Sequence, residues 1–421
     1  MANNLSSNTT TPLAKGFLKA VESTRVVSKA VNTQLLSGKF NPASGSTVDF
    51  KRSHMYNAIE TAGGDIGSST KSDILSGKAV GTVQNMITVA TEWSTLEEAL
   101  ELDELDAILM PMARTAITKL ETNLWTYMRN NSNLSTGTVG TVADAWSDVQ
   151  RAGALMESVG VPHDSAWNYI MNPYTAGGLA DAQNGLTAAD GLVRTAWEQA
   201  QISRDFGGMR AMTSNAMTSY TTGAGADRVG ALNADPVVTY VAHKDTMIQT
   251  LVVKSLDAAL PVKAGDVIQI TGRNRVNLDT NEVVFDQAGS AIPWRGTVTA
   301  DATASGGIVT LLVAGPAIFE AAGQYNTVDS APLEDDVVTI LGSASTVYQP
   351  NLFFHEQAFG LGTVKLPKLF STDTVATTSD GFSLRVSRYA DGDANTQKVR
   401  FDILPAFATF NPFFSGSGWG S

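Results

Sequence analysis

The residue types that could do chemistry are few and scattered along the chain. The 421 residues include no cysteine and four histidines, His54, His163, His243 and His355. Without cysteine, disulfides, thiolate zinc sites and cysteine nucleophiles are excluded. The histidines stand in unrelated segments, and none has the HExxH or other paired spacing that builds a metal site. We therefore interpret each as a solvated or core histidine.

Other catalytic patterns are also missing. There is no GxSxG turn and no S-x-x-K arrangement with its usual companions, so no nucleophile has a visible base. The stretch YADGDAN places Asp391 and Asp393 at alternate positions, like part of a calcium loop. It lacks the glutamate that closes such a loop, so a turn is the favoured interpretation and calcium the alternative. We predict no enzyme, no metal and no cofactor.

Composition and charge point to a protein that contacts other subunits. Charged residues make up 17% of the chain, against roughly 25% for an average soluble protein. Extensive subunit contact would explain this deficit, and so would a glycine-rich β fold.

The net charge of −12 has the wrong sign for binding phosphates tightly, although an acidic protein can still enclose DNA without binding it tightly. No apolar run suits a membrane span and no signal peptide is apparent, so we expect a cytoplasmic origin.

The charge is unevenly placed. From Pro12 to Leu36 a helical wheel gives an apolar side and a mostly basic outer side, which predicts an amphipathic helix in an N-terminal arm. Segment 92–106 is instead acidic, with no basic residue. A helix docked on its own domain, a membrane-surface helix and a solvated acidic face remain alternatives. We propose these side chains as candidate contacts between subunits: Lys15, Lys19, Arg25, Lys29, Glu97, Glu98 and Glu101.

Residues 46–91 predict an extended hairpin. Two alternating runs, STVDFKRSHMYNAI and AVGTVQNMITVATEW, flank a long connection rich in glycine and serine. A lone two-stranded ribbon is marginally stable in water, so this hairpin should need a partner surface. Its glycines do not form a phosphate loop, because no GK[ST] ending is present.

The segments that follow predict a mixed α and β architecture. A long helix is expected over 105–128, with Pro111 bending it or starting a second helix. Further helices are expected from Trp146 to a stop near Gly160, from Asn172-Pro173 to about Gln183, and over 188–200. Short strands are expected at WNYIM and FGGMRAMTSN.

Composition changes near Thr222, where helix formers give way to closely spaced strands. Seven candidates are DPVVTYVA, MIQTLVVKSL, GDVIQITG, NEVVFD, GTVTA, GIVTLLVA and DDVVTILGSA. They predict an antiparallel barrel or sandwich. The mixed pattern then resumes and ends in two strands joined by a turn at Asp391-Gly392. An all-β module therefore interrupts an α+β fold.

Long strings over the whole chain resemble the coat proteins of P-twenty-two-like tailed phages. They are QLLSGKFNPASGSTVDFKRSH, ADAWSDVQRAGALMESVGVP, YIMNPYTAGGLADAQNGL, LVRTAWEQAQISRDFGGMRAMTSN, PNLFFHEQAFGLGTVKLPKL and YADGDANTQKVRFDILPAFATFNP. The resemblance implies the α+β Hong Kong ninety-seven capsid fold with an inserted all-β antiparallel barrel domain. On that mapping the parts are the N-terminal arm (1–45), the extended loop (46–91), the peripheral domain with its spine helix (92–141), the axial domain (142–223 and 348–382), the inserted barrel (224–347) and the C-terminal peripheral strands (383–421).

The resemblance also implies a function. It suggests a major capsid protein that forms hexamers and pentamers of an icosahedral shell, assembled on a scaffolding protein with a portal protein at one vertex. The shell would expand on packaging double-stranded DNA, with weak and non-specific contact to that DNA and none to a membrane. Lys244 and Asp245 are candidates for a charged loop between subunits. A tail-tube or decoration protein, and an enzyme of unrecognised type, are the alternatives.

Overall fold

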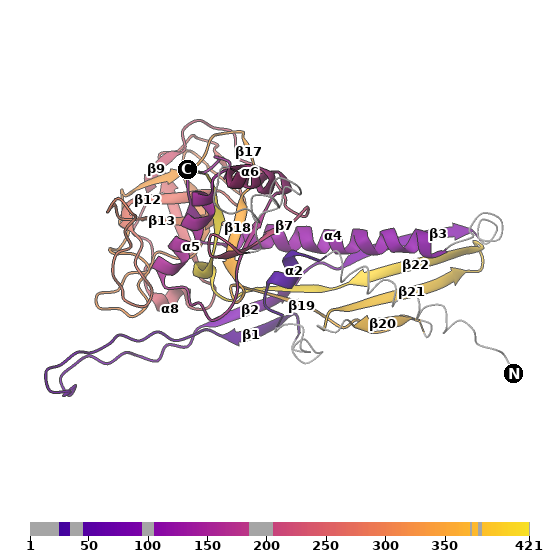
Figure 1. Ribbon diagram of the computed structural model, residues 1–421, viewed down its shortest axis with the longest axis horizontal. Helices are drawn as coiled ribbons and strands as arrows, with labels where there is room; N and C mark the ends of the chain where they lie inside the picture. The colour runs from indigo at the N-terminus through magenta and orange to yellow at the C-terminus, as the bar shows by residue number, and fades with distance from the viewer. Residues whose placement is uncertain are drawn as a thin grey trace. The chain divides into compact units, whose positions relative to one another are not determined.

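The computed structural model describes residues 25–33, 45–94, 105–184, 205–370, 373–377 and 381–420 (Figure 1). The chain divides into two compact units. The first is Met1–Asp49, Val80–Trp125 and Phe359–Ala408, and the second is Phe50–Ala79, Thr126–Ala358 and Thr409–Ser421. Each unit combines segments that are distant in the sequence, so long-range contacts hold each unit together.

The first unit contains an antiparallel sheet in the order β20, β21, β22, β3. The bounds of these strands are Thr374–Thr377, Ser383–Asp391, Thr396–Ile403 and Ile87–Ser94. Strands β21 and β22 confirm the predicted C-terminal hairpin, whose turn follows Asp391. The register of β22 with β3 runs from Thr396 opposite Ser94 to Ile403 opposite Ile87.

The predicted hairpin over 46–91 differs from the structure. Its second run is not one strand but two, β2 (Lys78–Val83) and β3, which pair with β23 and β22. Its first run is a strand, β1 (Thr47–Lys51), only at its start, and residues 52–77 contain no strand or helix. Strands β23 (Pro405–Thr409) and β19 (Phe359–Thr363) complete the sheet β1-β2-β23-β19. The run breaks at 84–86 because its partners β22 and β23 are themselves separated at Leu404.

Helix α4 (Leu105–Asn131) confirms the predicted long helix and continues through Pro111, so Pro111 does not start a second helix. Its buried apolar residues recur at spacings of three and four, as a helix packed on one side requires. They include Met112, Ala113, Ala116, Ile117, Leu120, Leu124 and Met128.

The predicted arm helix is wrong at its C-terminal end. Among residues 25–33, helix α2 covers Val27–Ala30, and Val31 is already extended. Asn32 forms a parallel bridge with Gly360, and its backbone N–H donates to the carbonyl of Phe359 at 3.0 Å. The chain thus satisfies its backbone groups beside β19 instead of in a further helical turn.

The second unit contains a mixed sheet in the order β4, β24, β18, β5, β7, β6. Their bounds are Leu134–Thr136, Ser415–Gly418, Asn351–His355, Trp167–Met171, Met209–Thr213 and Asp205–Phe206. Helices α5 (Trp146–Val159) and α6 (Pro173–Asn184) and the 3-10 helix η2 (Pro412–Phe414) accompany it. Gly160, left-handed at a φ of 93°, ends α5 as predicted.

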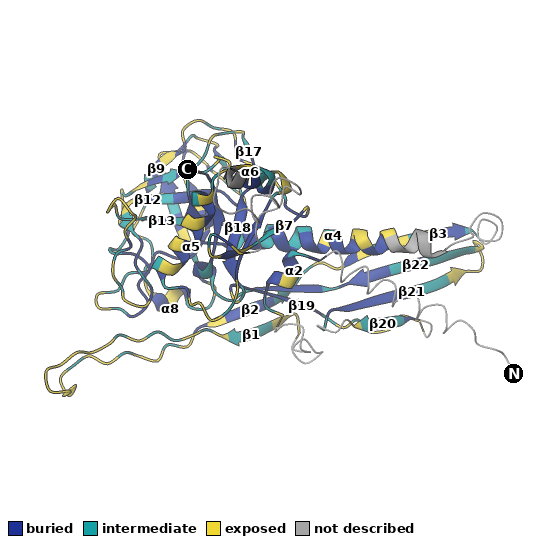
Figure 2. Cartoon of the chain, viewed as in Figure 1, coloured by how far each residue is buried: buried dark blue, intermediate teal, exposed yellow. Residues whose placement is uncertain are grey.

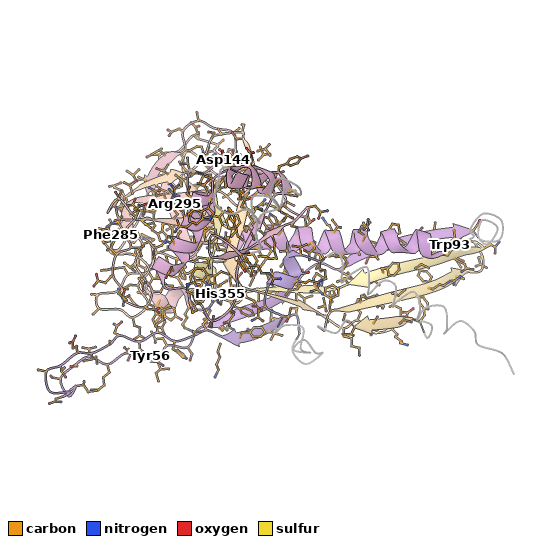
Figure 3. All side chains as sticks on the ribbon, in the orientation of Figure 1. Tyr56, Trp93, Asp144, Phe285, Arg295 and His355 are labelled. Carbon is orange, nitrogen blue, oxygen red and sulfur yellow. The ribbon has the colours of Figure 1, made fainter. Side chains whose placement is uncertain are left out.

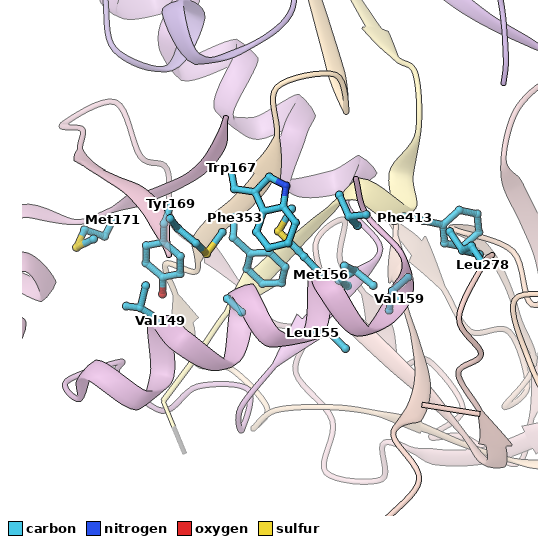
Figure 4. Packing of buried hydrophobic residues seen from close by; sticks show 14 of the residues in the cluster. Val149, Leu155, Met156, Val159, Trp167, Tyr169, Met171, Leu278, Phe353 and Phe413 are labelled. Carbon is cyan, nitrogen blue, oxygen red and sulfur yellow. The ribbon is translucent and has the colours of Figure 1, made fainter. Parts of the chain in front are cut away.

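One apolar cluster forms the core of this sheet and its helices. It joins Val149, Met156 and Val159 of α5 to Trp167 and Phe353 of the sheet (Figure 4). The opposite face of α5 is exposed (Figure 2). Burial of one face stabilises the helix by roughly 25 cal/mol for each Å² of apolar surface removed from water.

A closed antiparallel barrel lies in the second unit, in the order β10-β15-β13-β12-β16-β9. The strands are Ile248–Lys254, Val309–Ala314, Pro293–Val298, Val267–Asn274, Val337–Ile340 and Val229–Leu232. Its interior is a separate apolar cluster that includes Ile268, Trp294 and Ile340. The predicted class, α+β with an inserted antiparallel barrel, is therefore confirmed, and the barrel replaces the sandwich alternative.

The two ends of the barrel segment meet. Strand β8 (Tyr220–Thr221) pairs antiparallel with β17 (Val347–Tyr348), and the N–H of Thr222 donates to the carbonyl of Thr346 at 3.0 Å. A module can be inserted into another fold without disturbing it when its ends are adjacent. The boundaries 224–347 remain a prediction.

Some strand predictions in this segment are wrong. The last three residues of the predicted strand DPVVTYVA, 240–242, lie in the single helical turn α8 (Tyr240–His243). Tyr240 and His243 are the buried residues of that turn, and this spacing of three is helical. NEVVFD makes only isolated bridges, and β9 and the pair β11 (Pro261–Val262) and β14 (Ala302–Thr303) were not predicted.

Candidate assembly surfaces

His355 is the histidine with the most suggestive neighbours, but their geometry does not make a nucleophile. The Nε2 of His355, which is labelled in Figure 3, lies 2.9 Å from Asp164 Oδ1 and 3.0 Å from Ser165 Oγ. Its Nδ1 accepts the N–H of Gln357 at 3.2 Å, so in the neutral ring the proton is on Nε2. Burial lowers the pKa of His355, which keeps the ring neutral. A ring that already carries a proton on Nε2 cannot remove the proton of Ser165.

The other residues considered for chemistry have structural contacts. The ring nitrogens of His243 lie 3.1 and 2.8 Å from the carbonyls of Ile248 and Val237. Asp391 Oδ1 accepts the N–H groups of Asp393 and Ala394, which is the geometry of a turn. Over the described ranges, no three histidine or acidic side chains come together as a metal site would need. No helix in those ranges is long and apolar enough to cross a membrane.

The most unusual surface is the extended segment, which we define as residues 52–77. It carries large apolar side chains that face solvent: Tyr56, Ile59, Ile66 and Ile74 are 57%, 37%, 42% and 73% exposed. Figure 2 colours most of this segment as exposed, and Figure 3 labels Tyr56 on it. Every hydrogen bond described for residues 59–71 stays within the segment. Exposed apolar side chains on a segment without regular structure, whose tip has no described hydrogen bond to the rest of the chain, indicate a surface for another molecule.

Charged residues hold the base of the extended segment, which we define as its two ends next to β1 and β2. Arg52 donates through Nε to the carbonyls of Lys78 (3.1 Å) and Lys244 (3.0 Å), and through Nη1 to the carbonyl of Phe410. Burial lowers the pKa of Arg52 to about 10, and the nearby Tyr240 and Asp245 partly oppose this shift. The guanidinium therefore remains charged at neutral pH and ties the two ends of the segment to the rest of its unit.

Lys244 and Asp245, predicted as contacts between subunits, also act at this base within the chain. Lys244 Nζ donates to the carbonyl of Ser76 at 3.2 Å, and Asp245 Oδ1 accepts the N–H of Lys78 at 3.2 Å. The two side chains pair with each other at 3.2 Å. Gly77 fits closely here, because a Cβ at this position would lie 2.5 Å from the carbonyl oxygen of Lys244. Whether they also contact a second subunit stays a prediction.

A second group of contacts comes from residues 320–325 and from Asn281. Gln324 Nε2 donates to the carbonyl of Asp73 at 2.6 Å, and Asn57 Nδ2 donates to the carbonyl of Ala322 at 3.0 Å. Asn281 Nδ2 donates to Asn57 Oδ1 at 3.2 Å. Residues 281 and 320–325 thus fix both sides of the base, at Asn57 and Asp73, and these contacts do not extend to residues 59–71.

The predicted arm residues fall into two groups. Lys15, Lys19, Glu97, Glu98 and Glu101 lie outside the described residues. Lys29 is exposed, as expected for an outer face.

Arg25 contradicts its predicted place on that outer face. It is only 3% exposed and its guanidinium carbon lies 5.0 Å from the centre of the Phe382 ring. Its Nε donates to Ser28 Oγ at 2.7 Å. A planar guanidinium can be buried when an aromatic face and a hydroxyl satisfy it.

Sequence reasoning missed Glu121, which fixes the arm. This buried carboxylate of α4 accepts the N–H groups of Val26, Val27 and Ser28 at 3.2, 2.7 and 3.1 Å. It satisfies the free donors at the start of α2. The sequence feature that could have identified Glu121 is an acidic residue directly beside the apolar stripe of α4, next to Leu120.

No comparable sequence feature identifies Gly77, Asn57 and Gln324 as contacts at the base of the extended segment.

Comparisons with known proteins agree over the whole length. The model of the family described as P22 coat protein, gene protein 5, matches residues 1–419. A curated protein named "Major capsid protein", from Acyrthosiphon pisum secondary endosymbiont phage 1, is 42% identical over 431 residues and covers 100% of both chains.

Solved structures are similar at lower levels. One titled "Mycobacterium phage Che8" has a TM-score of 0.47 and 11% identity, covering 93% of this chain and 90% of that chain. "Capsid structure of the Cyanophage P-SCSP1u" has a TM-score of 0.44 and 10% identity, covering 93% and 86%. The sequence matches, not these weaker structural likenesses, carry the assignment.

Proposed function

Because the chain belongs to the P22 coat protein family, and is thus a major capsid protein of a phage, we propose that it polymerises into a closed icosahedral shell around double-stranded DNA. The architecture is the Hong Kong ninety-seven-like capsid fold with an inserted β-barrel, as expected from the sequence. The match to coat proteins over the whole chain disfavours the tail-tube and decoration alternatives. We propose no catalytic role and no cofactor.

The extended segment is the observation that supports polymerisation most strongly. Its base is fixed by hydrogen bonds within the chain, whereas Ile59, Ile66 and Ile74 stay in contact with water. Full burial of such a side chain contributes about 1.5–3 kcal/mol. A neighbouring subunit that covers the segment would supply this stabilisation, and each subunit could in turn cover another.

The details of assembly are proposals that follow from the family. Hexamers and pentamers would form on a scaffolding protein in the host cytoplasm, with a portal protein at one vertex. Expansion would accompany DNA packaging, and the shell would become part of the virion. The acidic net charge of −12 supports weak, non-specific contact with the enclosed DNA.

The domain boundaries and arm contacts are likewise proposed. The parts would be an arm (1–45), an extended loop (46–91), a peripheral domain (92–141 and 383–421), an axial domain (142–223 and 348–382) and the inserted barrel (224–347). The basic arm would contact the acidic segment 92–106 of a neighbour, the scaffolding protein or the packaged DNA.

Shortening the extended segment tests the function. Residues 59–71 can be replaced by Asn-Gly, because the N–H of Asn57 already lies 2.9 Å from Ser72 Oγ and a two-residue turn can close the gap. The base contacts remain in this variant, so the subunit should fold and yet assemble poorly when expressed with the scaffolding protein. The control carries Glu60→Ala and Lys71→Ala, which keep the apolar side chains. Shells of normal yield and stability from the shortened variant would contradict the proposal.

A further inference from the structure

A groove in the second unit is lined by residues that take no part in the contacts at the base of the extended segment. It runs between helix α5 and the loop that precedes β13, and its volume is about 850 Å³. Pockets that bind ligands usually have volumes of ~300–1,000 Å³. Leu155, Phe285 and Ile292 contribute apolar surface, and Phe285 is 59% exposed. Arg151 and Arg295 contribute positive charge.

Arg295 has no acidic partner among the described residues. It donates through Nη1 to the carbonyls of Gly137 at 3.0 Å and Ser135 at 3.5 Å, and through Nε to the side-chain oxygen of Gln269 at 3.2 Å. All three acceptors are neutral, and Nη2 has no hydrogen bond within the described part of the chain. Figure 3 labels Arg295 and Phe285. Burial lowers the pKa of Arg295, so its surroundings do not compensate its charge.

A second arginine behind Arg295 increases the uncompensated charge. Arg275 is 2% exposed and donates to Asn133 Oδ1 at 2.7 Å and to the carbonyl of Arg295 at 2.8 Å. Burial first, and the charge of Arg295 second, lower the pKa of Arg275 to about 9. Buried charges are normally paired, because an unpaired one is costly. The hydrogen bonds described for these two guanidinium groups go only to neutral acceptors, so an anion bound at Arg295, which lines the groove, would compensate part of their charge.

Two acids lie at or beside the groove. Asp286 lines it, and its Oδ1 accepts the N–H groups of Ala288 and Ser290 at 2.9 and 2.8 Å, which holds this carboxylate oxygen against its own loop. Asp148 is buried and reaches Arg151 only at 3.7 Å, while the side chain of Arg151 is 49% exposed. The groove thus offers two arginines to an incoming anion.

We propose that this groove binds an acidic and partly apolar peptide segment of a second protein, whose carboxylates pair with Arg295 and Arg151. Its apolar residues pack against Phe285 and Leu155. Charge complementarity identifies the anion, and the apolar wall favours a peptide over a nucleic acid, as does the net charge of −12 on the whole chain. The proposal goes beyond capsid assembly and does not depend on it, because it concerns the unassembled subunit.

Fluorescence polarisation with the purified full-length chain tests the site. The probe is a labelled peptide of alternating glutamate and leucine, compared with its glutamine-leucine counterpart and with an oligothymidylate. The glutamate peptide should bind, and the glutamine peptide should bind at least about tenfold more weakly, because the charge pairs are lost. Binding should weaken as salt is added.

Variants locate the binding. Arg151→Glu changes an exposed side chain and should leave the fold intact while weakening binding at least about tenfold. Arg295→Gln should do the same, with thermal denaturation checking its stability. Arg210→Gln, an exposed arginine of the same unit outside the groove, is the control and should bind like the unchanged chain. No binding of the glutamate peptide, equal binding by Arg151→Glu, or preference for the oligothymidylate would each overturn the proposal. Shell formation, measured separately, decides the proposed function.

Discussion

The barrel should fold around its own core, and Ile268 is the position that tests this most sharply. Ile268 and Ile340 are 0% and 2% exposed and lie opposite each other in the pairing of β12 with β16. Replacing a buried isoleucine by alanine costs about 2–5 kcal/mol. Ile268→Asp places a carboxylate in a cluster of buried apolar side chains, at a further cost of several kcal/mol.

These magnitudes predict different outcomes for the two variants. A domain is stable by about 5–15 kcal/mol, so Ile268→Ala should stay folded with a lower melting temperature, whereas Ile268→Asp should unfold the barrel. Val337→Ala is the matched control on β16, since Val337 is 43% exposed, and should change stability by no more than about 0.5 kcal/mol.

The excised segment 224–347 allows a direct assay. It contains a single tryptophan, Trp294, which is fully buried in the barrel core, so its fluorescence reports unfolding of the barrel. The fragment should give dispersed amide signals in a two-dimensional NMR spectrum, and Ile268→Asp should collapse them. In the full chain that variant should aggregate before assembly. A random-coil spectrum for the unchanged fragment, or a folded Ile268→Asp fragment, would refute the reasoning.

Three further predictions concern the base, acid stability and the arm. Gly77→Ala should force the base of the extended segment apart, because its Cβ would clash with a backbone oxygen, and limited proteolysis should then cut the segment faster. Since burial lowers the pKa of His355 below the ordinary value of 6.5 for a histidine, folded protein binds fewer protons than unfolded protein, and stability should fall as pH drops below that value. His355→Gln should flatten this part of the stability curve in thermal denaturation across pH. Changing Lys15, Lys19 and Lys29 together to glutamate should slow assembly at low salt more than at high salt, which light scattering measures, whereas single changes should be mild.

The sequence predicted helices and strands best where the local residue pattern agrees with the packing in the structure. Helix α4 follows its apolar stripe, α5 ends at Gly160, and alternation in GDVIQITG marks a barrel strand. Each of these depends on spacing within a short window, which the sequence displays directly.

The sequence-based predictions were wrong where distant segments decide the local structure. The run 79–93 forms two strands, β2 and β3, because their partners β23 and β22 are separated at Leu404. The arm helix ends where Asn32 forms a bridge with Gly360. The contacts at the base of the extended segment join residues such as Asn57 and Ala322, far apart in the chain. No periodicity in either segment announces such a pairing, so the partners of the extended segment within its own unit could not be predicted.

Electron microscopy of particles formed with the scaffolding protein tests the central claim most directly. The claim is that the chain forms a closed shell in which a neighbour covers the extended segment. A reconstruction should show closed icosahedral particles, with residues 59–71 lying on another subunit and Ile66 and Ile74 removed from solvent. Absence of closed particles, or closed particles in which this segment stays exposed, would contradict the account.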